Sequence, residues 1–151
     1  MRHSPAGAER LRAFRALRER QNALVLDTGT LVTRRFFALD SAAYRDGALP
    51  GLTKEMLGLV ASLVLRCDDC VTYHLIRCRD LGATRAQIVE ALDVGLVVGG
   101  SIVIPHLRRA AETNDALAAE SAGTDDAASG RRRAGGGSRN APRRRQKRSP
   151  S

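Results

Sequence analysis

The stretch Cys67-Asp68-Asp69-Cys70-Val71-Thr72-Tyr73-His74 decides how the rest of the chain is interpreted. It places two thiols three residues apart, and an imidazole four residues after the second thiol. In a chain without a secretion signal, a close cysteine pair is either a redox pair or part of a metal site. The apolar segments on both sides have helical spacing, so this stretch is expected to lie between packed helices.

Basic residues are concentrated at one end of the chain. Of the 25 Lys and Arg residues, nine lie between Arg131 and Arg148, where no acidic residue occurs. This leaves 16 basic against 16 acidic residues before position 130, so the net charge of +9 belongs to the C-terminal segment. Apolar periodicity stops after Leu117, and such a polar segment cannot bury enough surface to offset the entropy of ordering it.

Helical spacing of apolar residues, with no strand pattern, predicts an all-α bundle. The expected helices are Glu9–Leu26, Leu31–Tyr44, Thr53–Leu65, one from Asp68 or Asp69 to about Arg79, one from the capping box Thr84–Gln87 to Gly99, and a last one from about Ser101 towards Leu117. We therefore expect an N-terminal extension with an amphipathic helix (residues 1–30), a helical domain (31–117) and a disordered Arg-rich tail (118–151). A core of Leu, Val, Ile and Ala is expected, because the chain contains no Trp.

Four local features are predicted from the residue types. The second helix is expected to bury Val32, Phe36 and Leu39 on one face. Thr53 is expected to cap the third helix, and Asp68 or Asp69 the fourth. Gly82 is expected to close the fourth helix in a left-handed conformation.

The chain shows no sign of export or of membrane insertion. It begins without the apolar core of a signal peptide. Its longest apolar runs, Met56–Leu65 and Val94–Pro105, are too short to span a bilayer. With three cysteines and no secretion signal, a reducing cytoplasmic location is expected.

The cysteine pair has features of a redox centre. A thiol attacks as thiolate, and the start of a helix lowers a thiol pKa through its free N–H groups and dipole. His74 lies four residues after Cys70, on the same helical face, where it can exchange a proton with the thiol. Asp68 and Asp69 oppose thiolate formation unless they face away from the thiols.

Glu55 is the carboxylate expected to complete the set. If the helices before and after Arg66 form an antiparallel hairpin, Glu55 and His74 lie at about the same level, because they are equidistant from its midpoint. A glutamate in an apolar helix needs a partner. Glu55, His74 and Cys70 then form a proton relay in which the base is oriented by a third group.

These residues carry a family resemblance. Glu55, then Cys67-x-x-Cys70-x-x-x-His74, followed by Leu81-Gly82-Ala83-Thr84, Ile88, Ala91-Leu92 and Gly99-Gly100, resembles the carboxymuconolactone decarboxylase-like family, in particular its alkylhydroperoxidase D-like branch. The resemblance covers about Phe36 to Ala111. It implies an all-helical subunit of a homotrimer or hexamer that acts as a thiol-dependent antioxidant peroxidase or as a disulfide reductase.

The resemblance also implies roles for the catalytic residues. Cys70 would attack the hydroperoxide and become a sulfenic acid, and Cys67 would condense with it to a disulfide. Glu55 and His74 would move the proton, and no cofactor would take part. A protein or small-molecule dithiol would then reduce the disulfide, entering through the more exposed cysteine, expected to be Cys67.

Other interpretations of the same residues remain open. Cys67, Cys70, His74 and Glu55 are the right types for four ligands of a tetrahedral metal site. A decarboxylase-like lyase or isomerase would use Glu55 and His74 without the thiols. The basic residues 131–148 would give weak, nonspecific nucleic-acid contact if the protein is a nucleic-acid-associated one that acts through its tail. The alternative is a solvated tail with no partner. Cys78 is expected to be a small buried hydrophobe, and His106 to lie at the surface or an interface.

Overall fold

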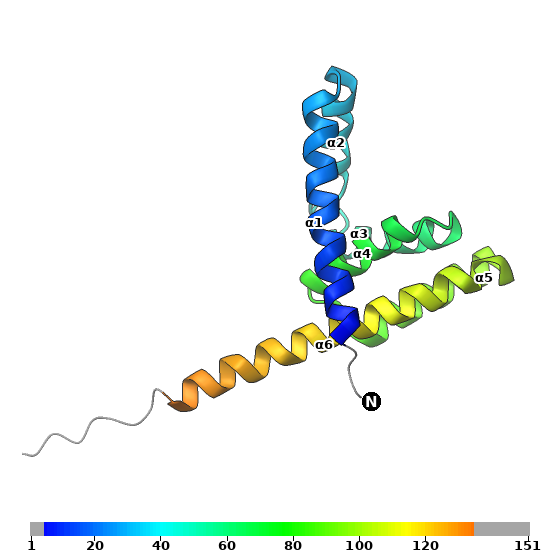
Figure 1. The fold of residues 1–151 in the computed structure, drawn as a ribbon. Helices are drawn as coiled ribbons and strands as arrows, with labels where there is room; N and C mark the ends of the chain where they lie inside the picture. Colours follow the sequence, from blue (N-terminus) through cyan, green and yellow to red (C-terminus); the bar gives the residue numbers. More distant parts are fainter. Residues whose placement is uncertain (1–4, 135–151) are drawn as a thin grey trace, which may run out of the picture.

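Six α-helices and one short 3-10 helix make up residues 5–134, the part of the chain that the structure describes (Figure 1). The structure is a computed structural model. The elements are α1 (Pro5–Thr28), α2 (Leu31–Ala43), α3 (Gly51–Val64), α4 (Asp68–Asp80), α5 (Arg85–Gly99), η1 (Ser101–Val103) and α6 (Ile104–Ala134). No strand occurs within residues 5–134, so the predicted all-α class is confirmed.

The helices form a body and an arm. Helices α3, α4 and α5 and the first part of α6 form the body, and the α1–α2 pair stands away from it (Figure 1). The start of α1 crosses α6, where a Cβ atom at Gly7 would come within 2.9 Å of the Ala116 methyl group. Ion pairs of Arg10 with Glu112 and of Arg15 with Glu120 also join these two helices.

The buried core is aliphatic, as predicted. It is centred on α3, α4 and α5 and extends along α6 to the start of α1; its fully or almost fully buried members include Leu11, Leu59, Leu63, Val71, Leu75, Ile88, Leu92, Val103 and Leu117. Burying one such side chain stabilises the fold by about 1.5–3 kcal/mol. This packing fixes α4, and with it the cysteine pair at its start.

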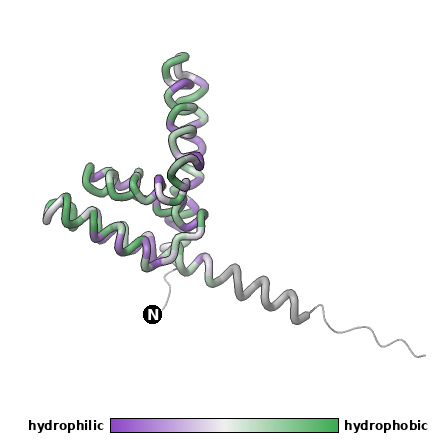
Figure 2. Tube along the Cα trace, turned by 180° about the vertical axis from the view of Figure 1, so that it is seen from behind, coloured by the Kyte–Doolittle hydropathy of each residue, from purple (hydrophilic) through white to green (hydrophobic). Residues whose placement is uncertain are grey.

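The prediction that α2 buries an apolar face is wrong for the single chain. Val32, Phe36 and Leu39 are 76%, 65% and 69% exposed, and α2 has no buried residue. The apolar spacing is helical as expected, but α2 contacts little besides α1. A second exposed apolar face lies on α5, at Val97 and Val98; α5 is largely green in Figure 2.

The starts of two helices test the capping predictions. Helix α3 begins at Gly51 rather than at Thr53, because the Asp46 carboxylate accepts a hydrogen bond from the Gly51 N–H at 2.6 Å. Asp46 lies outside the helix and supplies the acceptor that Thr53 was expected to supply. At the start of α5, the predicted capping box of Thr84 and Gln87 is confirmed, with both reciprocal bonds present.

The ends of α3 and α4 share one motif. After α3, the N–H groups of Arg66 and Cys67 donate to the carbonyls of Leu63 and Ser62, each at 3.0 Å, with Arg66 at φ 59°. The same pair of bonds closes α4, where Gly82 takes the left-handed position at φ 89° as predicted. This is the Schellman motif, which favours glycine. After α3 it holds an arginine instead, directly before Cys67.

The predicted boundary at Leu117 is not the end of the last helix. Helix α6 continues to Ala134, although the apolar spacing stops at Leu117. Alanine has the highest helix propensity, and the segment after Leu117 is rich in it. The expected disorder of 135–151 and the expected nucleic-acid contact through the side chains of 131–148 lie outside the described residues. Within residues 5–134, no helix is long and apolar enough to cross a membrane.

Candidate functional site

Helices α3 and α4 bring Glu55 and His74 together. The Glu55 Oε2 atom lies 2.7 Å from His74 Nδ1, and the two side chains are only 3% and 9% exposed. The antiparallel hairpin therefore places them at one level, which confirms the prediction. The Arg77 Nε atom, 3.5 Å from Glu55 Oε1, gives the buried carboxylate a second partner. Sequence reasoning missed Arg77, although it lies three residues after His74 on the same helix.

The contact with Glu55 fixes which His74 nitrogen is available for chemistry. An ionised carboxylate only accepts hydrogen bonds, so His74 carries a proton on Nδ1. In the neutral ring, Nε2 is then the unprotonated nitrogen and can act as a base. The Nε2 edge of the ring faces Gly58, where an added Cβ would lie 2.8 Å from Nε2 and 2.8 Å from the Tyr44 hydroxyl oxygen. Gly58 therefore leaves the space into which the imidazole and this hydroxyl converge.

Tyr44 is a site residue that sequence reasoning missed, because its position in the sequence indicates only the end of the second helix. Its ring centroid lies 5.4 Å from that of His74. Burial, and then the negative charges of Asp40 and Glu55, raise the pKa of Tyr44. The hydroxyl is therefore protonated at neutral pH and can donate a hydrogen bond.

Cys67 and Cys70 form a disulfide at the start of α4, with their Cα atoms 5.3 Å apart. Cys67 is itself the N-cap residue, and its sulfur accepts from the Cys70 N–H at 3.4 Å. The prediction that Asp68 or Asp69 caps α4 is therefore wrong. A sulfur in this position receives the stabilisation that a helix N-terminus gives to negative charge.

The two cysteines differ in exposure, in the direction opposite to the prediction. Cys70 is exposed, whereas Cys67 is only partly exposed. The cap position turns the Cys67 sulfur back over the first turn of α4, which leaves Cys70 as the more accessible partner.

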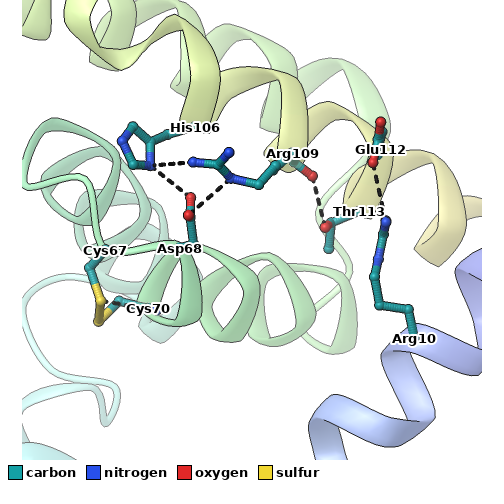
Figure 3. Close-up of polar contacts among 8 residues, drawn as sticks. All are labelled: Arg10, Cys67, Asp68, Cys70, His106, Arg109, Glu112 and Thr113. Carbon is teal, nitrogen blue, oxygen red and sulfur yellow. Dashed lines mark hydrogen bonds and ion pairs between the residues drawn. A yellow bond between two sulfur atoms is a disulfide. The ribbon is translucent and has the colours of Figure 1, made fainter.

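Asp68 faces away from the disulfide (Figure 3). Its carboxylate lies 2.8 Å from His106 Nδ1 and 2.9 Å from Arg109 Nε, both on α6. Although burial opposes it, the bonds from Arg109 and His106 lower the pKa of Asp68 below its usual value. Sequence reasoning missed this cluster because His106 and Arg109 lie 38 or more residues after Asp68.

A cavity of about 340 Å³ adjoins Cys70 and His74. Its wall comes from α1, α2 and α4, and consists of Phe14, Leu17, Arg18, Gln21, Asn22, Asp40, Tyr44, Asp69, Cys70, Tyr73 and His74. The Arg18 guanidinium stacks on the Tyr73 ring at 3.9 Å from its centroid. Neither Cys67 nor Glu55 lines the cavity; Cys67 is joined to it through the bond to Cys70, and Glu55 through the contact with His74.

Two further sequence interpretations can be compared with the geometry. Among the residues that the structure describes, no three His, Cys, Asp or Glu side chains converge as metal ligands. The four candidate ligands are instead paired as a disulfide and a Glu55–His74 contact. Cys78 is fully buried, as expected, and burial raises its pKa to about 12.

Known proteins share this fold. The family model described as the carboxymuconolactone decarboxylase family matches residues 30–113. An uncharacterized protein of Cupriavidus necator is 33% identical over 84 residues, which are 56% of this chain and 74% of that protein.

Solved structures agree with that family. A Thermotoga maritima protein of 57% identity superposes with a TM-score of 0.72, over 74% of this chain and 97% of that one. It is described as a carboxymuconolactone decarboxylase family protein "possibly involved in antioxidative response". A Legionella pneumophila family member, 28% identical, has a TM-score of 0.62 over 72% of this chain and 95% of its own. The chain described here belongs to the carboxymuconolactone decarboxylase family.

Proposed function

We propose that this protein is a thiol-dependent oxidoreductase that cycles Cys67 and Cys70 between dithiol and disulfide, as a peroxidase or a disulfide reductase. The observation that carries the proposal is that Cys70 and His74 line one cavity while Glu55 fixes the opposite nitrogen of His74. A nucleophile, a base and a group that orients the base are the parts that activated-thiol chemistry needs.

In the peroxidase half-reaction, His74 Nε2 takes the proton of the Cys70 thiol. The thiolate attacks the outer oxygen of a hydroperoxide ROOH, so that an S–O bond forms as the O–O bond breaks. The alkoxide takes the proton back from His74 and leaves as ROH. Cys67 then attacks the Cys70 sulfur, forming the disulfide and releasing water.

Reduction begins at Cys70, the more exposed of the two cysteines. A donor thiolate attacks Cys70, and Cys67 leaves as a thiolate in its N-cap position, where the Cys70 N–H stabilises it. The second donor thiol then releases Cys70 as the donor becomes a disulfide. A Cys67→Ser variant should therefore retain a donor as a mixed disulfide on Cys70, and a Cys70→Ser variant should retain less. Equal trapping on both would contradict this order of attack.

The size and the apolar side of the cavity favour an organic hydroperoxide over hydrogen peroxide as the substrate. Its volume of about 340 Å³ far exceeds what a molecule near the size of water needs, and Phe14 and Leu17 give it an apolar side. The proposal predicts a higher kcat/KM for cumene hydroperoxide than for hydrogen peroxide. A Leu17→Asp variant should bring the kcat/KM values for the two peroxides closer together.

The test of the proposal is a peroxide titration of the reduced protein followed by mass spectrometry. One equivalent of cumene hydroperoxide should remove two hydrogens from the peptide containing Cys67 and Cys70. Cys70→Ser should abolish this product, and Cys78→Ser should not, because Cys78 is buried. If wild type and Cys70→Ser consume peroxide equally slowly, the redox proposal is wrong.

The exposed apolar faces support a homo-oligomer, as the family resemblance implies. Phe36 on α2 and Val97 on α5 are 65% and 84% exposed in the single chain. Exposed apolar patches of this kind favour burial between copies. Light scattering should give the mass of a trimer or hexamer, and Phe36→Asp or Val97→Asp should reduce it. A monomeric wild type at micromolar concentration would contradict the assembly.

A further inference from the structure

Asp68 stands between the two cysteines in the sequence, yet its charge is directed to α6. Figure 3 shows its carboxylate facing His106 and Arg109, while the disulfide lies on the other side of the chain. The Arg109 Nε–Asp68 Oδ2 distance is 2.9 Å, and the Asp68 side chain is 41% exposed. The pair is accessible to solvent, so its contribution to stability is small. Its effect on the adjacent thiol can be larger than its effect on folding.

His106 contacts both members of this pair. Its Nδ1 atom is 2.8 Å from Asp68 Oδ1 and 3.1 Å from Arg109 Nη2. An ionised Asp68 only accepts, so the proton on Nδ1 points to the carboxylate. Arg109 also only donates, and its approach to the same nitrogen is then a packing contact and not a hydrogen bond. Asp68 is therefore the acceptor for two donors from one turn of α6.

We propose that Arg109 and His106 are positioning residues for the thiol chemistry: Arg109 neutralises the Asp68 carboxylate, and both residues turn it away from the thiols, where it would otherwise suppress the Cys67 thiolate. A carboxylate one residue from a thiol favours the protonated thiol. A guanidinium cannot lose its charge, so it compensates Asp68 throughout the working pH range. The start of α4 then retains its stabilising effect on negative sulfur.

Other charged groups surround the cysteine pair and stay unchanged in the test. They come from the same turn, from α1, from α2 and from the α3–α4 pair: Arg66, Asp69, Arg18, Asp40, Glu55 and His74. The inference rests on the proposed redox function only for its consequence in turnover. Its direct readout is the reactivity of each thiol, which needs no peroxide.

The experiment measures iodoacetamide alkylation of Cys67 and Cys70 in the reduced full-length protein as a function of pH, resolved by mass spectrometry. Arg109→Gln should decrease the thiolate fraction of Cys67 at neutral pH by about threefold, and Asp68→Asn should increase it by about threefold. This size corresponds to roughly half a pKa unit, which is less than a near charge gives at a buried site. The double variant should return to within about 1.5-fold of wild type.

Opposite changes of the Cys67 thiolate fraction in Arg109→Gln and Asp68→Asn distinguish this role from a purely structural one. If the cluster only held α4 against α6, both single variants would lower the melting temperature and shift the thiol in one direction, and that result overturns the inference. Shifts below about 1.5-fold overturn it too. Arg109→Lys, which keeps the charge, should behave as wild type even if Arg109→Gln folds poorly. Arg10→Gln, which breaks a similarly exposed ion pair to α6 at Glu112, is the matched control and should leave both thiols unchanged.

Failure of this inference can be distinguished from failure of the proposed function. If the two single variants change the Cys67 thiolate fraction in opposite directions but the protein does not consume peroxide, the role of the Asp68–Arg109 pair stands and the peroxidase proposal is wrong. If the protein turns over peroxide but the variants do not change the Cys67 thiolate fraction, only the role proposed for Asp68, His106 and Arg109 is wrong.

Discussion

Gly58→Ala tests whether the position of His74 controls the reactivity of the site. The added Cβ would lie 2.6 Å from His74 Cε1, about 0.9 Å inside the ~3.5 Å at which carbon atoms normally touch. The ring must retreat from α3, which also carries Glu55, so the 2.7 Å contact of Nδ1 with the carboxylate lengthens beyond hydrogen-bond range. A displacement of about 1 Å costs on the order of 100-fold in rate.

The assay is the single-turnover rate of disulfide formation in reduced protein after addition of cumene hydroperoxide. Stability should change less than the rate: alanine gains up to about 1 kcal/mol over glycine within a helix, and overpacking costs about 1–3 kcal/mol. Gly95→Ala is the matched control, because its added methyl meets the flexible end of Leu63 at 2.8 Å, in the core. A Gly58→Ala protein that reacts within twofold of wild type would refute the role assigned to His74.

Three other predictions concern the stability of the fold and the reactivity of Cys78. Arg66→Gly should raise the melting temperature by a few degrees, because replacing a left-handed non-glycine residue by glycine is worth roughly 1 kcal/mol. Gly82→Ala in the same motif at the end of α4 should lower the melting temperature by a similar amount. The pKa of Asp68 is lower in the folded protein, so its pairing stabilises the fold above the carboxyl's unfolded pKa and is lost as pH falls through the folded value. Melting curves of wild type and Asp68→Asn should accordingly converge on acidification, and a constant difference down to pH 2 would contradict this. Cys78, with its pKa raised to about 12, should resist iodoacetamide at pH 8 until the protein is denatured.

The Glu55–His74 pair could be predicted from the sequence because it depends only on helical rise and on one short turn. Two antiparallel helices of equal rise bring together residues that are equidistant from the turn, and a buried carboxylate needs a partner. The family resemblance added roles to these positions. The geometry of the pair did not depend on it.

Asp68 shows why the rest of the site could not be predicted. Its residue type and position fit a helix N-cap, and local preferences contain no information about Arg109, which lies on a distant helix. Once that tertiary ion pair forms, the cap position falls to the sulfur of Cys67. Tyr44 was missed for a similar reason, because its place in the site depends on a tertiary contact in which its hydroxyl group faces Gly58 on α3.

The apolar face of α2 illustrates a different limit. Periodicity correctly predicted a helix with one apolar side, but it cannot say which molecule covers that side. Phe36 is exposed in the single chain because no other element of the described residues packs over it. Likewise, the extension of α6 beyond Leu117 follows from alanine propensity and not from a buried stripe.

Helix α1 lies outside residues 30–113, the part that matches the family, yet Phe14, Leu17 and Arg18 from it form one side of the cavity. The residues to which the proposed function assigns the thiol chemistry and this side of the cavity are thus encoded by separate segments of the gene. Under the proposed function, a chimera that exchanges only the first 29 residues would change which hydroperoxides enter the cavity while Glu55, Cys67, Cys70 and His74 stay unchanged.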